Sequence, residues 1–108
     1  MQYRKLSNNC GNVDVNRVLS RFLNTGDTFF KNEYNTSDYK VIIAVFDKVG
    51  LVAGAYYGIN LIFKSNASAT TVEVIVTGGK FEKLAVGRIA DSGMIEQIVS
   101  RLNQCGFY

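Results

Sequence analysis

The sequence predicts an α+β domain, in which two amphipathic helices pack on one face of a curved antiparallel sheet. Three consecutive segments within residues 39–77 alternate as strands do, and only short turn-like segments separate them. A segment with helical periodicity lies near each end of the chain. The expected order is β-α-β(4-5)-α, with the sheet a meander of 4–6 strands.

Length and composition indicate one folded domain over residues 1–108. Hydrophobic residues make up 47% of the 108 positions and charged residues 19%, which is typical of a globular protein. No apolar run is long enough to cross a membrane. The first six residues do not have the pattern of a signal peptide, so we expect a cytoplasmic protein with no membrane partner.

The N-terminal third begins with a short edge strand, predicted from Gln2 to Leu6. A helix follows, for which Asn12 or Asp14 is the expected N-cap. Its apolar stripe has the spacing of one buried helix face. The members are Val15, Val18, Leu19, Phe22 and Leu23. Gly26 is the expected end of the helix.

Residues 27–34 are predicted as a strand that leads into the meander, with Phe29 or Phe30 facing inward. A tight turn over 35–38 connects it to the next strand, over 39–48. Both faces of that next strand are apolar in the middle, with Val41, Ile43 and Val45 on one and Ile42, Ala44 and Phe46 on the other. We therefore expect a central strand that is at least partly covered on both sides.

Two further strands complete the meander. In residues 52–64 the odd positions form the core face, and Gly54 and Gly58 fall on the other face. Such glycines mark either simple curvature or a shallow groove where another group approaches the backbone. In residues 70–77 Val72, Val74 and Val76 are expected to face inward.

The C-terminal part should contain one more strand, over 83–89, and a second helix that begins at Asp91 or Ser92. The buried stripe of this helix is expected to be Ile95, Ile98, Val99 and Leu102, and Gly106 is expected to end it. The aromatic tail over 107–108 fits either a contact with its own domain or a contact with a partner.

This predicted order of elements is similar to that of TATA-binding-protein-like and helix-grip folds. It also resembles small uncharacterised bacterial α+β proteins. The resemblance is one of topology, so no functional residue follows from it.

The residue types available for chemistry are few. The chain has no histidine, which removes the commonest general base and metal ligand. Its two cysteines, Cys10 and Cys105, are too far apart in sequence for a redox motif, and the sequence cannot establish a bridge between them. The segment 77–80 lacks the frame of a phosphate-binding loop and is interpreted as a turn. We therefore expect no catalytic site, no metal and no cofactor.

Charge patterning argues against a nucleic-acid partner. The net charge is only +3, and the basic residues are scattered among acidic ones. Nucleic-acid binders usually gather basic residues on one face. Tyr56 with Phe46 could form a stacking platform for bases, but packing is the more common role of such rings.

The leading functional hypothesis is a non-enzymatic binding module. One sheet face is predicted to be more apolar than a solvated face needs to be. Its members are Ile42, Ala44, Phe46, Gly54, Tyr56 and Gly58. A second copy of the chain, giving a homodimer, is the expected occupant. A small apolar ligand in a groove between sheet and helix is the alternative, followed by a nucleic acid and then an enzyme.

Overall fold

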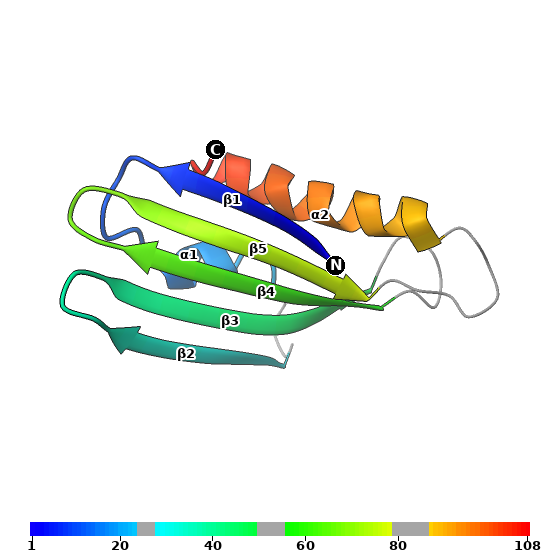
Figure 1. Cartoon of the computed structure of the whole chain (residues 1–108), viewed down its shortest axis with the longest axis horizontal. Helices are drawn as coiled ribbons and strands as arrows, with labels where there is room; N and C mark the ends of the chain where they lie inside the picture. Colours follow the sequence, from blue (N-terminus) through cyan, green and yellow to red (C-terminus); the bar gives the residue numbers. More distant parts are fainter. Residues whose placement is uncertain (24–27, 50–55, 79–86) are drawn as a thin grey trace.

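Five antiparallel strands form a single sheet in the computed structural model, with two helices beside it (Figure 1). The structure describes residues 1–23, 28–49, 56–78 and 87–108. The strands are β1 (Gln2–Asn8), β2 (Phe29–Asn35), β3 (Lys40–Val49), β4 (Tyr56–Ser65) and β5 (Thr70–Gly78). The helices are α1 (Val15–Leu19) and α2 (Gly87–Gln104). The predicted α+β class is confirmed at this level.

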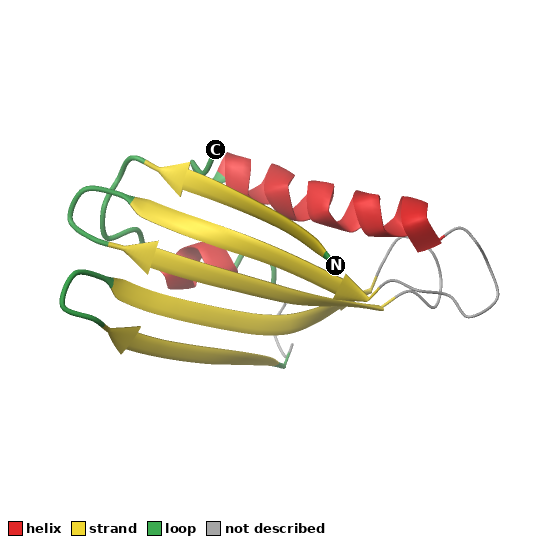
Figure 2. Cartoon of the chain, in the orientation of Figure 1, coloured by secondary structure: helices red, strands yellow, loops and turns green. Residues whose placement is uncertain are grey.

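The strand order across the sheet is β1-β5-β4-β3-β2. Strands β2 to β5 follow one another as a meander. Strand β1 pairs with β5 and so forms the edge of the sheet opposite β2 (Figure 2). Strands β1 and β2 are therefore the two edges. The predicted edge strand over 2–6 is confirmed and extends to Asn8.

The core lies on one face of the sheet. Alternate residues of β4 and β5 are almost completely buried there, in agreement with the predicted inward positions. They are Tyr57, Ile59, Leu61 and Phe63 of β4, and Val72, Val74 and Val76 of β5. Buried residues of both helices belong to the same apolar cluster. This face of the sheet is called the core face below.

Helix α1 is shorter than its apolar stripe predicts. Asp14 is the N-cap, and its carboxylate accepts a hydrogen bond from the backbone N–H of Arg17. Regular helix ends at Leu19, but the chain continues through tight turns, and Phe22 still packs in the core with its ring centroid 6.2 Å from that of Phe46. The apolar stripe thus packs against the core although only its first three members lie in the helical turn. The predicted end at Gly26 lies outside the described residues.

Helix α2 begins earlier than predicted, at Gly87 instead of Asp91 or Ser92. The predicted strand over 83–89 is wrong for 87–89, which are helical, and 83–86 lie outside the described residues. Ile95, Ile98 and Leu102 are buried as predicted. The helix contacts β1 and β5, and so it covers that half of the core face (Figure 1).

The C-terminal tail docks on its own domain. Gly106 follows α2 with φ of +94°, a conformation that favours glycine and reverses the chain. Phe107 is then fully buried, and Tyr108 exchanges two backbone hydrogen bonds with Ser7 of β1, at 3.0 and 2.8 Å. The tail therefore occupies part of the outer edge of β1.

Strand β2 is exposed along its whole length. All seven of its residues are exposed, and it pairs with β3 on one side only. The prediction of a strand is confirmed, but the prediction that Phe29 or Phe30 faces inward is wrong, because their side chains are 42% and 60% exposed. The described part of α2 contacts β5 and β1 at the other end of the strand order, and α1 reaches β2 through the side-chain hydrogen bond from Lys31 to Asn16.

Candidate functional site

The sheet face that points away from the helices is the candidate functional surface. We call it the open face. It is formed by the residues that alternate with the buried ones, and its members follow from the strand register. Its aliphatic members are Val41, Ile43 and Val45 of β3, Ile62 of β4 and Ile75 of β5. Of these, Val41 is buried and the other four are half-buried.

Aromatic side chains surround this aliphatic centre. Phe30 pairs with Val45, and Tyr34 with Val41, so β2 adds two rings on the open face. Tyr39 precedes β3, and the Lys64 ammonium lies 4.2 Å from the centroid of its ring. Tyr56 is 67% exposed at the start of β4. Half-buried aliphatic residues ringed by exposed aromatic ones are the composition of a protein interface core.

The open face carries balanced charge. Lys5, Asp47, Lys64 and Glu73 lie on it, two of each sign. Tyr3 donates a hydrogen bond of 2.8 Å to the Glu73 carboxylate. This hydrogen bond raises the pKa of the Tyr3 phenol, because ionisation would remove the proton that the bond requires and would also place a second negative charge beside Glu73. The described residues of the open face therefore carry no excess of positive charge.

The six residues predicted to share a ligand or interface face do not lie together. Ile42, Ala44 and Phe46 pair with Phe63, Leu61 and Ile59, which places them on the core face, where they are buried. This is a correction to the prediction. Both faces of the strand are apolar, so its own alternation could not indicate which one the helices cover.

The other three predicted residues separate as well. Tyr56 and Gly58 are on the open face, opposite Val49 and Asp47. Gly54 lies outside the described residues. The alternation pattern did identify a second apolar face; the members that sequence reasoning missed are Ile43, Val45, Ile62 and Ile75, which are themselves regular alternation positions.

Gly58 does not open a vacant groove. A β-carbon at this position would lie 2.7 Å from the Thr77 hydroxyl, so the threonine side chain fills the space that the missing side chain leaves. The Thr77 hydroxyl also donates a long hydrogen bond of 3.5 Å to the Gly58 carbonyl. Close approach of a neighbouring side chain therefore accounts for this strand glycine.

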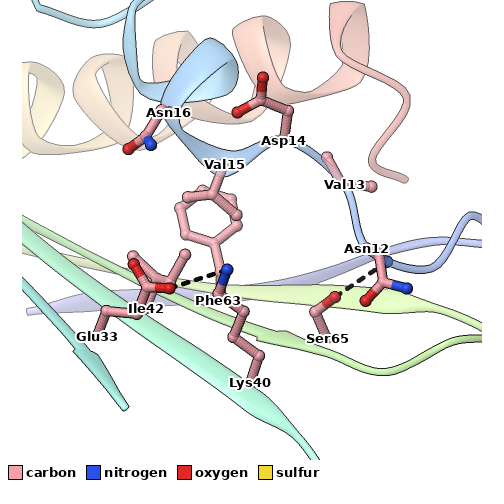
Figure 3. Close-up of a pocket in the computed structure, with 10 residues that line it drawn as sticks. All are labelled: Asn12, Val13, Asp14, Val15, Asn16, Glu33, Lys40, Ile42, Phe63 and Ser65. Atoms are coloured by element: carbon pink, nitrogen blue, oxygen red, sulfur yellow. Dashed lines mark hydrogen bonds and ion pairs between the residues drawn. The ribbon is translucent and has the colours of Figure 1, made fainter. Parts of the chain in front are cut away.

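A small cleft lies on the core side, between the start of α1 and the strands (Figure 3). Its volume is about 180 Å³. The apolar lining consists of Val13, Val15, Ile42 and Phe63; the polar lining consists of Asn12, Asp14, Asn16, Glu33, Lys40 and Ser65. Figure 3 shows the polar groups of α1 on one side and the Glu33–Lys40 pair on the other. The cleft is smaller than the roughly 300 Å³ at which typical ligand pockets begin.

An ion pair and a hydrogen bond join β2 to the elements around this cleft. Lys40 Nζ lies 2.8 Å from Glu33 Oε1, and Lys31 Nζ donates to Asn16 Oδ1 of α1 at 2.7 Å. The hydrogen bond from Lys40 lowers the pKa of the Glu33 carboxyl below its ordinary value. These exposed contacts position side chains but contribute little to stability.

A polar cluster fixes the loop before α1. The buried Thr70 hydroxyl donates to the Cys10 carbonyl, at 3.1 Å, and lies 3.1 Å from the Ser65 hydroxyl. The Asn12 N–H donates to Ser65 and to the Asn66 carbonyl. Both cysteines, Cys10 and Cys105, are free thiols.

Within the described ranges, no group of three Cys, Asp or Glu side chains is arranged to hold a metal ion. Nor does that part of the chain contain a helix with the length and apolarity needed to cross a bilayer. Comparisons with models of protein families, with curated protein sequences and with solved structures found no match.

Proposed function

We propose that this protein is a non-enzymatic binding module that associates with a second copy of itself through the open face. The observation that carries the proposal is the aliphatic centre formed by Ile43, Val45, Ile62 and Ile75, which no described helix covers. Uncovered apolar area of this kind marks an interaction surface in a protein otherwise well packed.

A second copy is the occupant that the chemistry favours. The aliphatic centre and its aromatic rim are complementary to the same surface on another copy. A two-fold axis places these two identical surfaces against each other, as in an isologous dimer. The charges around the rim are two positive and two negative, so a rotated copy can place opposite signs together. A strongly charged partner would find no complementary field on this face.

The test is the assembly state of paired variants, measured by sedimentation at micromolar concentration. Ile43→Glu places a charge in the aliphatic centre and should dissociate the face contact. Ser100→Glu adds the same charge on an exposed position of α2 and should behave as the wild type. Because Ile43 is half-buried, Tyr56→Ser at a 67% exposed ring of β4 provides a second, milder variant.

The proposal is refuted if Ile43→Glu and Tyr56→Ser both leave the wild-type assembly intact while both variants keep the wild-type circular dichroism spectrum. Phe46→Glu is not a suitable variant, although Phe46 belongs to the face predicted from the sequence. Phe46 is 3% exposed in the core, so a charge there tests folding and not association.

A small ligand in the cleft beside α1 is the second candidate function. A cavity of about 150 Å³ is enough to bind a molecule of benzene's size when its walls are apolar, and this cleft is of similar volume. Its mixed lining fits a small molecule with one polar end. Native mass spectrometry of the freshly purified protein tests this candidate, because it predicts extra mass that Val15→Trp removes.

A further inference from the structure

We propose that two copies of this chain also join edge to edge, by antiparallel pairing of β2 with β2 of the second copy around a two-fold axis at Asn32. This contact is separate from the open-face contact proposed above and does not depend on it. It uses the backbone edge of the sheet, whereas the first uses side chains on one face.

The two edge strands of the sheet differ in how far their outer backbone groups are already hydrogen-bonded. At β1 the outer edge is partly occupied, because Ser7 and Tyr108 exchange backbone hydrogen bonds. At β2 all seven residues are exposed, and no described strand pairs with its outer side. An exposed strand edge presents unpaired N–H and C=O groups that another strand can satisfy.

The sequence of β2 is complementary to a second copy of itself when the two strands pair antiparallel. With the axis at Asn32, Lys31 lies opposite Glu33 of the second copy, and Glu33 opposite its Lys31. Phe30 then lies opposite Tyr34 of the second copy. Lys31 and Glu33 point to the core side of the sheet, and Phe30 and Tyr34 to the open face. Each dimer would thus contain two opposite-charge pairs on one face and two aromatic pairs on the other.

The neighbouring registers lack this match. Moving the axis to residue 31 places Lys31 opposite Lys31 of the second copy, and moving it to residue 33 places Glu33 opposite Glu33. Like charges directly opposite each other destabilise a strand pair. Only the axis at Asn32 pairs both charges with their opposites, so the side chains specify the register as well as the partner.

The present contacts of these two side chains are compatible with the pairing. Lys31 donates to Asn16, and Glu33 accepts from Lys40 through Oε1. An ammonium has three donors, and a carboxylate accepts at both oxygens, so each side chain can hold its present partner and one more. The four side chains in these contacts are all exposed. The new pairs therefore form at the surface and require little desolvation of the charged groups.

Charge exchange provides the first test. Lys31→Glu and Glu33→Lys each turn both opposite-charge pairs into like-charge pairs, and each should weaken the edge contact by about tenfold. A mixture of the two variants restores opposite charges across the axis, so mixing should recover the wild-type assembly. The double variant, with the two charges exchanged in one chain, should also recover it. The Glu33→Lys variant also loses the ion pair between Glu33 and Lys40. That loss affects the single variant, but it cannot explain why mixing the two variants recovers the assembly.

Cross-linking provides a second test that is specific for the axis. In a background with Cys10→Ser and Cys105→Ser, Asn32→Cys places two thiols opposite each other at a distance that a disulfide spans. Asn35→Cys on the same exposed strand is the matched control, because its two copies would be separated by most of the strand. Rapid oxidation to a dimer at position 32 and not at 35 is the expected result. Equal rates at both positions would overturn the proposal.

The two proposals fail independently. If both contacts form, each variant removes one of them, so Ile43→Glu should leave edge dimers and Lys31→Glu should leave face dimers; together the contacts close into a tetramer when their two-fold axes cross at right angles. If Ile43→Glu gives monomers and position 32 does not cross-link, the edge contact is absent and the face contact stands. If position 32 cross-links and Ile43→Glu changes nothing, the edge contact stands alone.

Discussion

The ring of Phe107 lies edge-on against the ring of Phe63, with centroids 6.0 Å apart and planes inclined by 70°. This contact joins the last turn of the chain to the middle of the sheet. It holds Tyr108 where its backbone pairs with Ser7, and thereby fixes one edge of the sheet. The opposite edge, at β2, has no such cover in the described chain.

Removal of the Phe107 ring should destabilise the domain strongly. Phe107→Ala leaves a cavity in a fully buried site, for which we expect a loss of about 3–5 kcal/mol in the free energy of unfolding. Urea denaturation checks this value. Tyr108→Ala is the matched control, because its side chain is 77% exposed and its removal should change stability only slightly. Equal losses for both variants would show that the ring contact is not the anchor.

Replacement of Gly11 should be costly because backbone lies where a side chain would go. A β-carbon there would overlap with the Ala67 carbonyl group, so the loop before α1 must move away from the 65–69 turn. We expect Gly11→Ala to lower the unfolding free energy by about 1–3 kcal/mol. Gly93→Ala, in α2, has no atom within 4 Å of the new methyl group and should instead stabilise the helix by about 0.5–1 kcal/mol. Thermal melts of the two variants should shift in opposite directions.

Loss of the Thr70 hydroxyl should loosen the same loop. Thr70→Val keeps the shape of a fully buried side chain but leaves the Cys10 carbonyl and Ser65 without this partner. The expected cost is about 1–3 kcal/mol. Amide hydrogen exchange should show faster exchange at Asn12, whose N–H contacts Ser65. Thr77→Val, at an exposed position whose hydroxyl makes only a long bond, is the control and should be nearly neutral.

Acid should remove the small contribution of the Glu33–Lys40 ion pair. The pKa of Glu33 is lowered in the folded state by the hydrogen bond from Lys40, from an ordinary value of 4.5. A lowered pKa means that the ion pair stabilises the fold fully above pH 4.5 and that this contribution is lost as pH falls through the folded value. Glu33→Gln should therefore lie closer to the wild type in stability at low pH than at neutral pH. A constant difference between them across this range would contradict the assignment.

The alternation of the strands predicted the sheet well wherever one face was polar. In β5 the pattern of Val72 and Val74 against Glu73 left only one inward face. In β3 both faces were apolar, and the inward set, Ile42 and its neighbours, was fixed only by pairing with β4. Register is a long-range property, and the strand's own sequence does not contain it.

Helix lengths were harder to predict than helix positions. The apolar spacing from Val15 to Leu23 is helical, yet regular helix ends at Leu19, because turns suffice to bury Phe22. The tail was open to either interpretation from sequence, and the positive φ of Gly106 directs Phe107 into the core. Of the residues assigned to the candidate face, the three from β3 lie on the core face, whereas Tyr56 and Gly58 lie on the open face.

The mass of the freshly purified wild-type protein under native conditions tests the central claim most directly. Association through the open face predicts a dimer, or a larger assembly if the β2 edge pairs as well, and Ile43→Glu should reduce the mass by half or more. A wild-type protein that remains a bare monomer at micromolar concentration would contradict self-association through this face.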